Sequence, residues 1–215
     1  MTPFHKLLQE YAPISSVAGC SKIRAHQASN VFALWHAWES ECQAICDVPY
    51  WAIVWPAAQA LSQYIMNNPS LVKGKTVLDC GCGGGVVAIA AAMNQAARSV
   101  GCDMDQPAID VAKYNAAINN VAIDLMCKDA TECYAPGSFD VILVADLFYQ
   151  KEFSRRLRAA LKKARDHGCD VIIADSGRPF LPKEELTEIH SQSAATSFDV
   201  EGCLSRTVRL YRFHD

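Results

Sequence analysis

The chain has 215 residues, half of them hydrophobic and a fifth charged, which is enough to bury the core of one α/β domain with a short extension. The formal net charge of -3 and the lack of any Lys/Arg run argue against a nucleic-acid partner. No apolar run is long enough to span a membrane, and residues 1–11 resemble neither a secretory signal nor a transit peptide, so we expect no membrane partner and a cytoplasmic location.

Ten cysteines are scattered along the chain without a CxxC pair. Their spacings do not form the ligand set of a structural zinc site, so we predict no metal. Disulfides are rare in a reducing cytosol, and Cys in strand-like runs behaves as a small apolar residue. We therefore expect buried free thiols.

The first 48 residues predict a helical N-terminal extension, because Phe32, Trp35 and Trp38 recur at helical spacing. An aromatic segment follows and ends at Pro56, where a helix begins that stops near Asn67. We place the boundary of the main domain here, so that residues 1–48 form the extension and residues 49–215 the domain.

From residue 75 onward, strands and helices alternate. The predicted strands are 76–80, 98–103, 122–127, 139–145 and 170–174, and the predicted helices are 86–94, 106–119, 151–167 and 183–196. Residues 197–213 predict two final strands with no helix between them. This order predicts a Rossmann-like α/β fold, with a mostly parallel seven-stranded sheet, helices on both faces and an antiparallel C-terminal hairpin at the sheet edge.

A glycine loop follows the first strand, reading D-C-G-C-G-G-G over residues 79–85. A dinucleotide requires G-x-G-x-x-G, and counted from Gly81 the third glycine falls on Val86. A frame that starts at Gly83 ends on Ala88, which the looser form of the motif permits. The spacing therefore weakens the dinucleotide interpretation and leaves it open.

Acidic residues stand at three successive strand ends. Asp79 precedes the glycines, where a carboxylate suits a ligand with positive charge and no phosphate; S-adenosylmethionine has an ammonium, a sulfonium and no pyrophosphate. The D-x-G-x-G-x-G pattern resembles the first motif of class I methyltransferases. That resemblance implies that Asp103 binds the ribose hydroxyls and that Asp129 lies near the adenine amino group. We expect Asp105 to cap the next helix. The predicted cofactor-binding residues are Trp55, Asp79, Gly81, Gly83, Gly85, Asp103, Asp129 and Asp146.

The fourth strand ends in D-L-F-Y, residues 146–149, which resembles the acidic D-x-x-Y motif of seven-strand protein lysine methyltransferases. An ordinary helix cap and a packed aromatic remain the alternative. A lysine amine has a pKa near ~10.4 and must lose a proton before it accepts a methyl group. We predict Asp146 and Tyr149 as catalytic residues. Asp146 would orient the amine, and Tyr149 would form the wall of an apolar pocket together with Trp51 and Trp55.

Several runs are similar to the electron-transfer flavoprotein β-subunit lysine methyltransferase family. They are residues 49–56 and 59–62, Gly74-Lys75, the D-L-F-Y motif and residues 177–179, so that the resemblance covers about residues 48–180. The glycine loop departs from the family at residues 82–85. Because residues 177–179 follow the fifth strand, we expect Arg178 at the rim of the site, where it would face an acidic partner surface or form an ordinary salt bridge.

Together these features predict an S-adenosylmethionine-dependent protein-lysine N-methyltransferase. The family resemblance implies the electron-transfer flavoprotein β-subunit as the first candidate substrate and a ribosomal protein as the second. The alternatives are a small-molecule methyltransferase of the same fold, an NAD-dependent oxidoreductase, and a non-catalytic interaction module that kept the fold.

Overall fold

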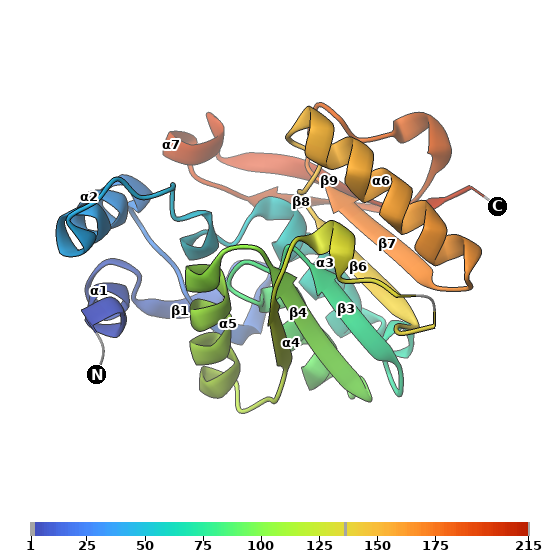
Figure 1. The fold of residues 1–215 in the computed structure, drawn as a ribbon, viewed down its shortest axis with the longest axis horizontal. Helices are drawn as coiled ribbons and strands as arrows, with labels where there is room; N and C mark the ends of the chain where they lie inside the picture. The colour runs from blue at the N-terminus through green and yellow to red at the C-terminus, as the bar shows by residue number, and fades with distance from the viewer. Residues whose placement is uncertain (1–2, 136, 215) are drawn as a thin grey trace.

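In the computed structural model, which describes residues 3–135 and 137–214, seven strands form one sheet in the order β5-β4-β3-β6-β7-β9-β8 (Figure 1). The first five strands in this order are parallel, and β9 is antiparallel to both of its neighbours. The predicted fold class is confirmed. The strands are β3 (Thr76–Cys80), β4 (Arg98–Asp103), β5 (Asp124–Cys127), β6 (Val141–Ala145), β7 (Asp170–Asp175), β8 (Leu186–Ala195) and β9 (Ser205–Phe213).

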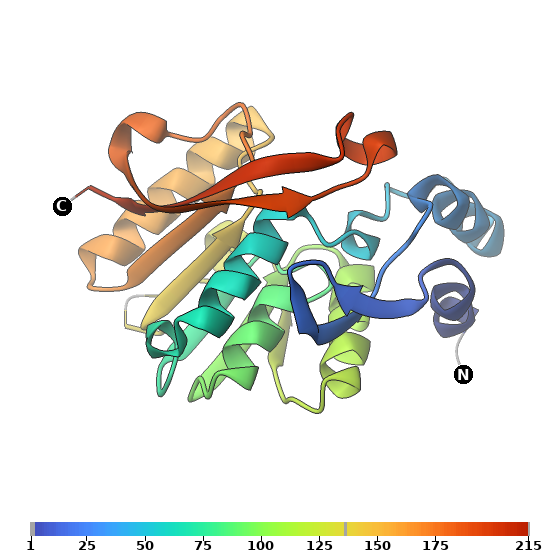
Figure 2. The ribbon, with the colours of Figure 1, turned by 180° about the vertical axis from the view of Figure 1, so that it is seen from behind.

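Helices cover both faces of the sheet. The helices α3 (Pro56–Asn67) and α4 (Val86–Met93) lie in front of the sheet in Figure 2, and α6 (Lys151–Asp166) lies in front of it in Figure 1. Residues 86–91 of α4 are all buried, which explains its uniformly apolar sequence. By contrast α6 buries Leu157, Leu161 and Ala164 at helical spacing and turns its charged residues to solvent. The helix α5 (Gln106–Ile118) packs on β4 and β5.

The N-terminal 48 residues are not wholly helical, which corrects the prediction. Between α1 (Pro3–Tyr11) and α2 (Val31–Cys42) lies an antiparallel hairpin of β1 (Ile14–Val17) and β2 (Cys20–His26). The hairpin is stabilised by tertiary contact, since β2 packs against α3, α4 and α5. The spacing of apolar residues within this segment gives no sign of that contact, so it does not predict the hairpin. The boundary between extension and domain stays a prediction.

The helix predicted over residues 183–196 is also wrong. Only the short turn η4 (Lys183–Glu185) is helical, and β8 occupies the rest as the outer strand beside β9. A four-residue helix, α7 (Phe198–Glu201), interrupts the connection between β8 and β9. The predicted antiparallel hairpin therefore exists, but its first strand begins at Leu186.

The β8–β9 hairpin extends beyond the rest of the sheet. Asp175 at the end of β7 pairs with Arg209, whereas residues 205–208 of β9 pair with β8 alone. Because β9 runs antiparallel to β7, these residues and α7 project past the carboxyl end of β7. This is the edge where ligands bind in open α/β sheets.

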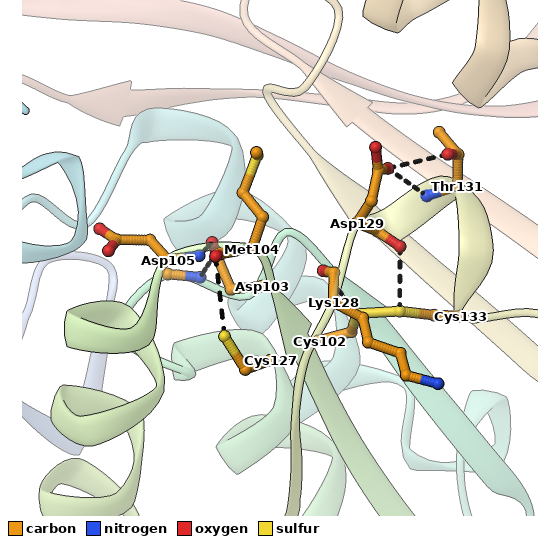
Figure 3. Close-up of a disulfide and its surroundings, with 10 residues drawn as sticks. Cys102, Asp103, Met104, Asp105, Cys127, Lys128, Asp129, Thr131 and Cys133 are labelled. Carbon is orange, nitrogen blue, oxygen red and sulfur yellow. Dashed lines mark hydrogen bonds between the residues drawn. A yellow bond between two sulfur atoms is a disulfide. The ribbon is translucent and has the colours of Figure 1, made fainter.

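One cysteine pair departs from the expected free thiols. Cys102, at the end of β4, forms a disulfide with Cys133, which follows η3 (Ala130–Glu132) (Figure 3). The two residues are 31 positions apart, and only the chain topology brings them together. Cys80, Cys82 and Cys169 are buried free thiols, as expected. In the described part of the chain, no helix is long and apolar enough to cross a membrane.

Candidate cofactor and acceptor site

The glycine loop lies at the point where the strand order reverses, between β3 and β6. Gly81, Gly83 and Gly85 have φ angles of +64°, +50° and +78°, in the left-handed region that side chains disfavour. A Cβ at Gly81 would lie 2.6 Å from a methyl carbon of Leu147, and one at Gly85 would lie 2.9 Å from the Cβ of Ala112. Both glycines are required by the packing. At Gly83 the nearest atom would be 3.9 Å away, so this glycine leaves open space.

A cavity lies between this loop and the aromatic segment that precedes α3. It includes four of the predicted cofactor residues, Trp55, Asp79, Gly81 and Gly83. The N-terminal hairpin and α5 contribute His26 and Asn115. The remaining lining residues are Trp51, Ile53, Val54, Ala58, Cys82, Gly84, Val86, Val87 and Ala145.

Asp79 lines the cavity and is buried, with 2% of its surface exposed. Its Oδ2 accepts a hydrogen bond of 2.9 Å from the Ala88 N–H, in the first turn of α4, so the carboxylate caps that helix. The pKa of Asp79 is raised to about 7, chiefly by burial and to a lesser degree by the nearby Asp103, against the lowering effect of the Ala88 hydrogen bond. No Lys or Arg within the described residues pairs with it. Asp79 is thus a carboxylate without a cationic partner.

Asp103 is the last residue of β4, and Asp129 follows the end of β5 as the N-cap of η3 (Figure 3). Neither residue lines the cavity. Asp103 accepts hydrogen bonds from the N–H groups of Gly83 (2.8 Å) and Asp105 (3.1 Å), and burial raises its pKa. Asp129 caps η3 by accepting from Thr131, and it pairs with Arg156 of α6 at 2.9 Å. Burial alone raises the pKa of Asp129, but these contacts hold it below the ordinary value.

Asp146 connects three segments behind the cavity. Its Oδ2 accepts from the Ala57 N–H at 3.0 Å, which caps α3. Its Oδ1 accepts from the N–H and hydroxyl of Ser176, at 3.0 and 2.7 Å, and from Nε of Arg178 at 3.0 Å. The side chain is 4% exposed and the backbone φ is +55°, a rare conformation that is most tolerated by Asp and Asn. These contacts make Asp146 a junction between β6, the loop after β7, and α3.

Of the two alternatives for Arg178, an acidic partner surface or a salt bridge within the chain, the structure shows the salt bridge. Its side chain is 18% exposed and is paired with Asp146 and, at 2.6 Å, with Glu201 of α7. Its guanidinium also lies 5.2 Å from the ring centre of Trp55. Burial alone lowers the pKa of Arg178, but the two carboxylates hold it above the usual value. Arg178 therefore joins the hairpin tip to the aromatic segment.

Tyr149 is 55% exposed and Tyr50 is 53% exposed. Burial of its other half raises the pKa of Tyr149, and the neighbouring Tyr50 and Asp103 raise it further. Tyr50 lies 5.8 Å from Trp55 between ring centres, and its carbonyl accepts from the indole N–H. The three rings form an aromatic rim at the carboxyl edge of the sheet.

Two residues of the cavity whose side chains form hydrogen bonds, Asn115 and His26, were not predicted as site residues. Asn115 is fully buried, accepts from the His26 N–H at 2.8 Å and donates to the Gly84 carbonyl at 2.8 Å, so it holds the hairpin against the loop. Its signal was a polar residue on the otherwise apolar face of α5. His26 is held by Ala12 through Nδ1, and burial lowers its pKa. The sequence had no signal for His26, because the hairpin itself was not foreseen.

A glycine loop at the switch point of a seven-stranded sheet with an antiparallel β9 defines the class I methyltransferase fold. Residues 58–174 match the family model described as Ribosomal protein L11 methyltransferase (PrmA), and the chain belongs to this family. The predicted methyltransferase class, whose methyl donor is S-adenosylmethionine, is confirmed.

Curated relatives include the electron transfer flavoprotein beta subunit lysine methyltransferases. The Mus musculus protein is 39% identical over 133 residues, which cover 61% of this chain and 52% of that protein. The Xenopus laevis protein is 39% identical over 168 residues, or 74% and 68% of the two chains. The chain thus spans about half the length of the mouse relative. The predicted family resemblance is confirmed.

Among solved structures, a putative RNA methyltransferase from Pyrococcus horikoshii has a TM-score of 0.56 at 22% identity and covers 74% of this chain and 83% of its own. At this identity the likeness concerns the fold alone.

Proposed function

We propose that this protein is an S-adenosylmethionine-dependent protein-lysine N-methyltransferase. The observation that carries the proposal is the cavity between the glycine loop and the aromatic segment, with the unpaired carboxylate of Asp79 in its lining and an aromatic rim at its edge. Curated relatives named as lysine methyltransferases support the choice of acceptor.

The residues present fit this cofactor. A ligand with positive charge suits Asp79, a buried carboxylate with no Lys or Arg partner in the described part of the chain. Asp103 is a partly buried carboxylate that likewise has no such partner, and it offers an acceptor for hydroxyl groups. The open space at Gly83 admits a ligand close to the backbone. We propose that Asp79 and the glycines hold the amino-acid part, Asp103 the ribose and Asp129 the adenine. When bound, the cofactor supplies an electrophilic methyl group on its sulfonium.

On the acceptor side, we propose that Tyr149 and Trp55 contact the lysine side chain and exclude water from it. Desolvation by such rings lowers the pKa of an amine, so a neutral amine is easier to form there. Asp146 as the residue that orients the amine stays a prediction. Its four hydrogen bonds support a positioning role, in which it holds the aromatic segment and Arg178 in place.

For the substrate, we propose a lysine on a folded protein, with the electron-transfer flavoprotein β-subunit as first candidate. A ribosomal protein is the second, since a relative described as Ribosomal protein L11 methyltransferase, from Pelobacter propionicus, is 40% identical over 83 residues. The cytoplasmic location also stays a prediction.

The test is incubation of the purified protein with labelled S-adenosylmethionine and recombinant flavoprotein β-subunit, followed by peptide mass spectrometry. We expect label on lysine, and a strong loss of turnover in Tyr149→Ala with unchanged cofactor affinity. Label confined to small molecules of a lysate would favour the small-molecule alternative. Thermal stabilisation by NAD and none by S-adenosylmethionine would favour the oxidoreductase.

A further inference from the structure

A second cavity opens beside the first and belongs to no part of the proposed cofactor site. One wall is the segment between β2 and α2, and the opposite wall is the connection between β8 and β9. No Lys or Arg lines it. Its lining residues include Ser29, Phe32, Gln59, Thr196, Ser197 and Asp199.

The floor of this groove is shared with the first cavity. Ile53 and Val54 line both, so a single stretch of the aromatic segment separates the groove from the glycine loop. A chain that lies in the groove is therefore next to the site where we place the methyl donor.

The wall formed by the hairpin tip is held firmly. Gln59 donates through Nε2 to the carbonyls of Val54 (2.7 Å) and Ala195 (3.0 Å), which ties the floor to the end of β8. Glu201 of α7, with its side chain 3% exposed, pairs with Arg178 at 2.6 Å and with Arg206 at 2.8 Å. The groove is thus built without a partner, and a ligand would not have to order it.

The rims of the groove carry groups that attract a cation. Phe32 is 47% exposed and Phe198, beside the lining residue Ser197, is 67% exposed. The carboxylate of Asp199 is exposed and makes no ion pair with any residue that the structure describes. Aromatic faces and carboxylates both favour Lys and Arg side chains.

We propose that this groove binds a basic, extended segment of the acceptor protein, adjacent to the lysine that is methylated. The inference rests on the proposed function. The lining hydroxyl groups of Ser29 on one wall, and of Thr196 and Ser197 on the other, offer hydrogen bonds to an extended main chain. The apolar floor accepts the aliphatic part of a long side chain, and Asp199 takes its charged end. A nucleic acid is disfavoured because the groove carries no cation for phosphate.

The experiment compares steady-state methylation of recombinant flavoprotein β-subunit by Phe198→Ala and Asp199→Lys with that of the unaltered protein. Each variant is expected to raise the KM for the acceptor protein about tenfold, the scale of an interface residue that contributes strongly. The kcat and the Kd for S-adenosylmethionine, measured by calorimetry, should stay within about twofold, because neither residue lines the cofactor cavity.

Two variants serve as matched controls. Leu204→Ala removes a 73%-exposed apolar side chain from the same hairpin connection without touching the groove, and Glu184→Lys reverses an exposed charge at the opposite end of β8. Both should keep the native KM. An unchanged KM in Phe198→Ala and Asp199→Lys, with the unaltered protein active, would overturn the groove and leave the proposed function standing. Absence of transfer by the unaltered protein would overturn both.

Discussion

The acids on the two sides of the β3–β6 switch point differ in their hydrogen-bond partners. On the β4 side, Asp79 and Asp103 accept hydrogen bonds from backbone N–H groups alone, and burial raises the pKa of both. On the β7 side, Asp146 and Glu201 share the guanidinium of Arg178. An acid with a permanent partner holds the fold together, whereas an acid without one leaves a charge that a cationic ligand can neutralise.

The largest effect is expected from breaking the paired side. Asp146→Ala leaves the partly buried Arg178 with fewer acceptors and removes the cap of α3. Loss of one partner of a largely buried ion pair costs about 3–5 kcal/mol of unfolding free energy. Denaturant titration measures this. Asp166→Ala, which removes an exposed acid paired with Arg165, should cost under about 1 kcal/mol. If Asp146→Ala also lowered the free energy of unfolding by less than about 1 kcal/mol, the role of Asp146 as a junction would be contradicted.

On the side without ion pairs, removing the charge of Asp79 should raise the free energy of unfolding. The pKa of Asp79 is 3.8 in the unfolded chain and about 7 in the folded protein, so unfolding releases a proton between these pH values. The free energy of unfolding therefore falls as pH rises through this window. Asp79→Asn keeps an acceptor for Ala88 and removes the charge. Without cofactor it should match the native protein near pH 4 and exceed it at pH 8 by up to about 4 kcal/mol. Equal denaturation midpoints of Asp79→Asn and the native protein at both pH values would contradict the raised pKa of Asp79.

Substitution of a glycine in the loop between the two sides should lower the free energy of unfolding by a smaller amount. Gly81→Ala forces a Cβ against Leu147 at a φ of +64°, and the strain and overlap together cost about 3 kcal/mol. Gly168→Ala, at a φ of +85° in open space, should cost only about 1 kcal/mol. Thermal unfolding of the two variants measures the difference in stability loss. Equal losses would show that the Leu147 side chain moves aside without cost.

The smallest effect concerns the ligand alone. Asp103→Ala is expected to weaken S-adenosylmethionine binding by about 1–3 kcal/mol, the scale of a lost charge-assisted hydrogen bond. Calorimetric titration measures it. Asp124→Ala removes an exposed acid at the other end of the neighbouring strand and should bind normally. Native affinity in folded Asp103→Ala would exclude Asp103 from the ribose site.

The sequence alone determined the alternation of strands and helices, the glycine loop and the acids at the strand ends. These features are local, because burial on a sheet and backbone conformation determine the residue types at neighbouring positions.

Only the tertiary structure decided the rest. Residues 186–195 became a strand because β9 offered its edge, and the N-terminal hairpin formed because α3, α4 and α5 cover it. The partners of Asp146 come from α3 and from the loop after β7, tens of residues away in either direction, and no spacing rule connects them. The same holds for the Cys102–Cys133 disulfide, since a contact between distant segments is set by how the chain packs.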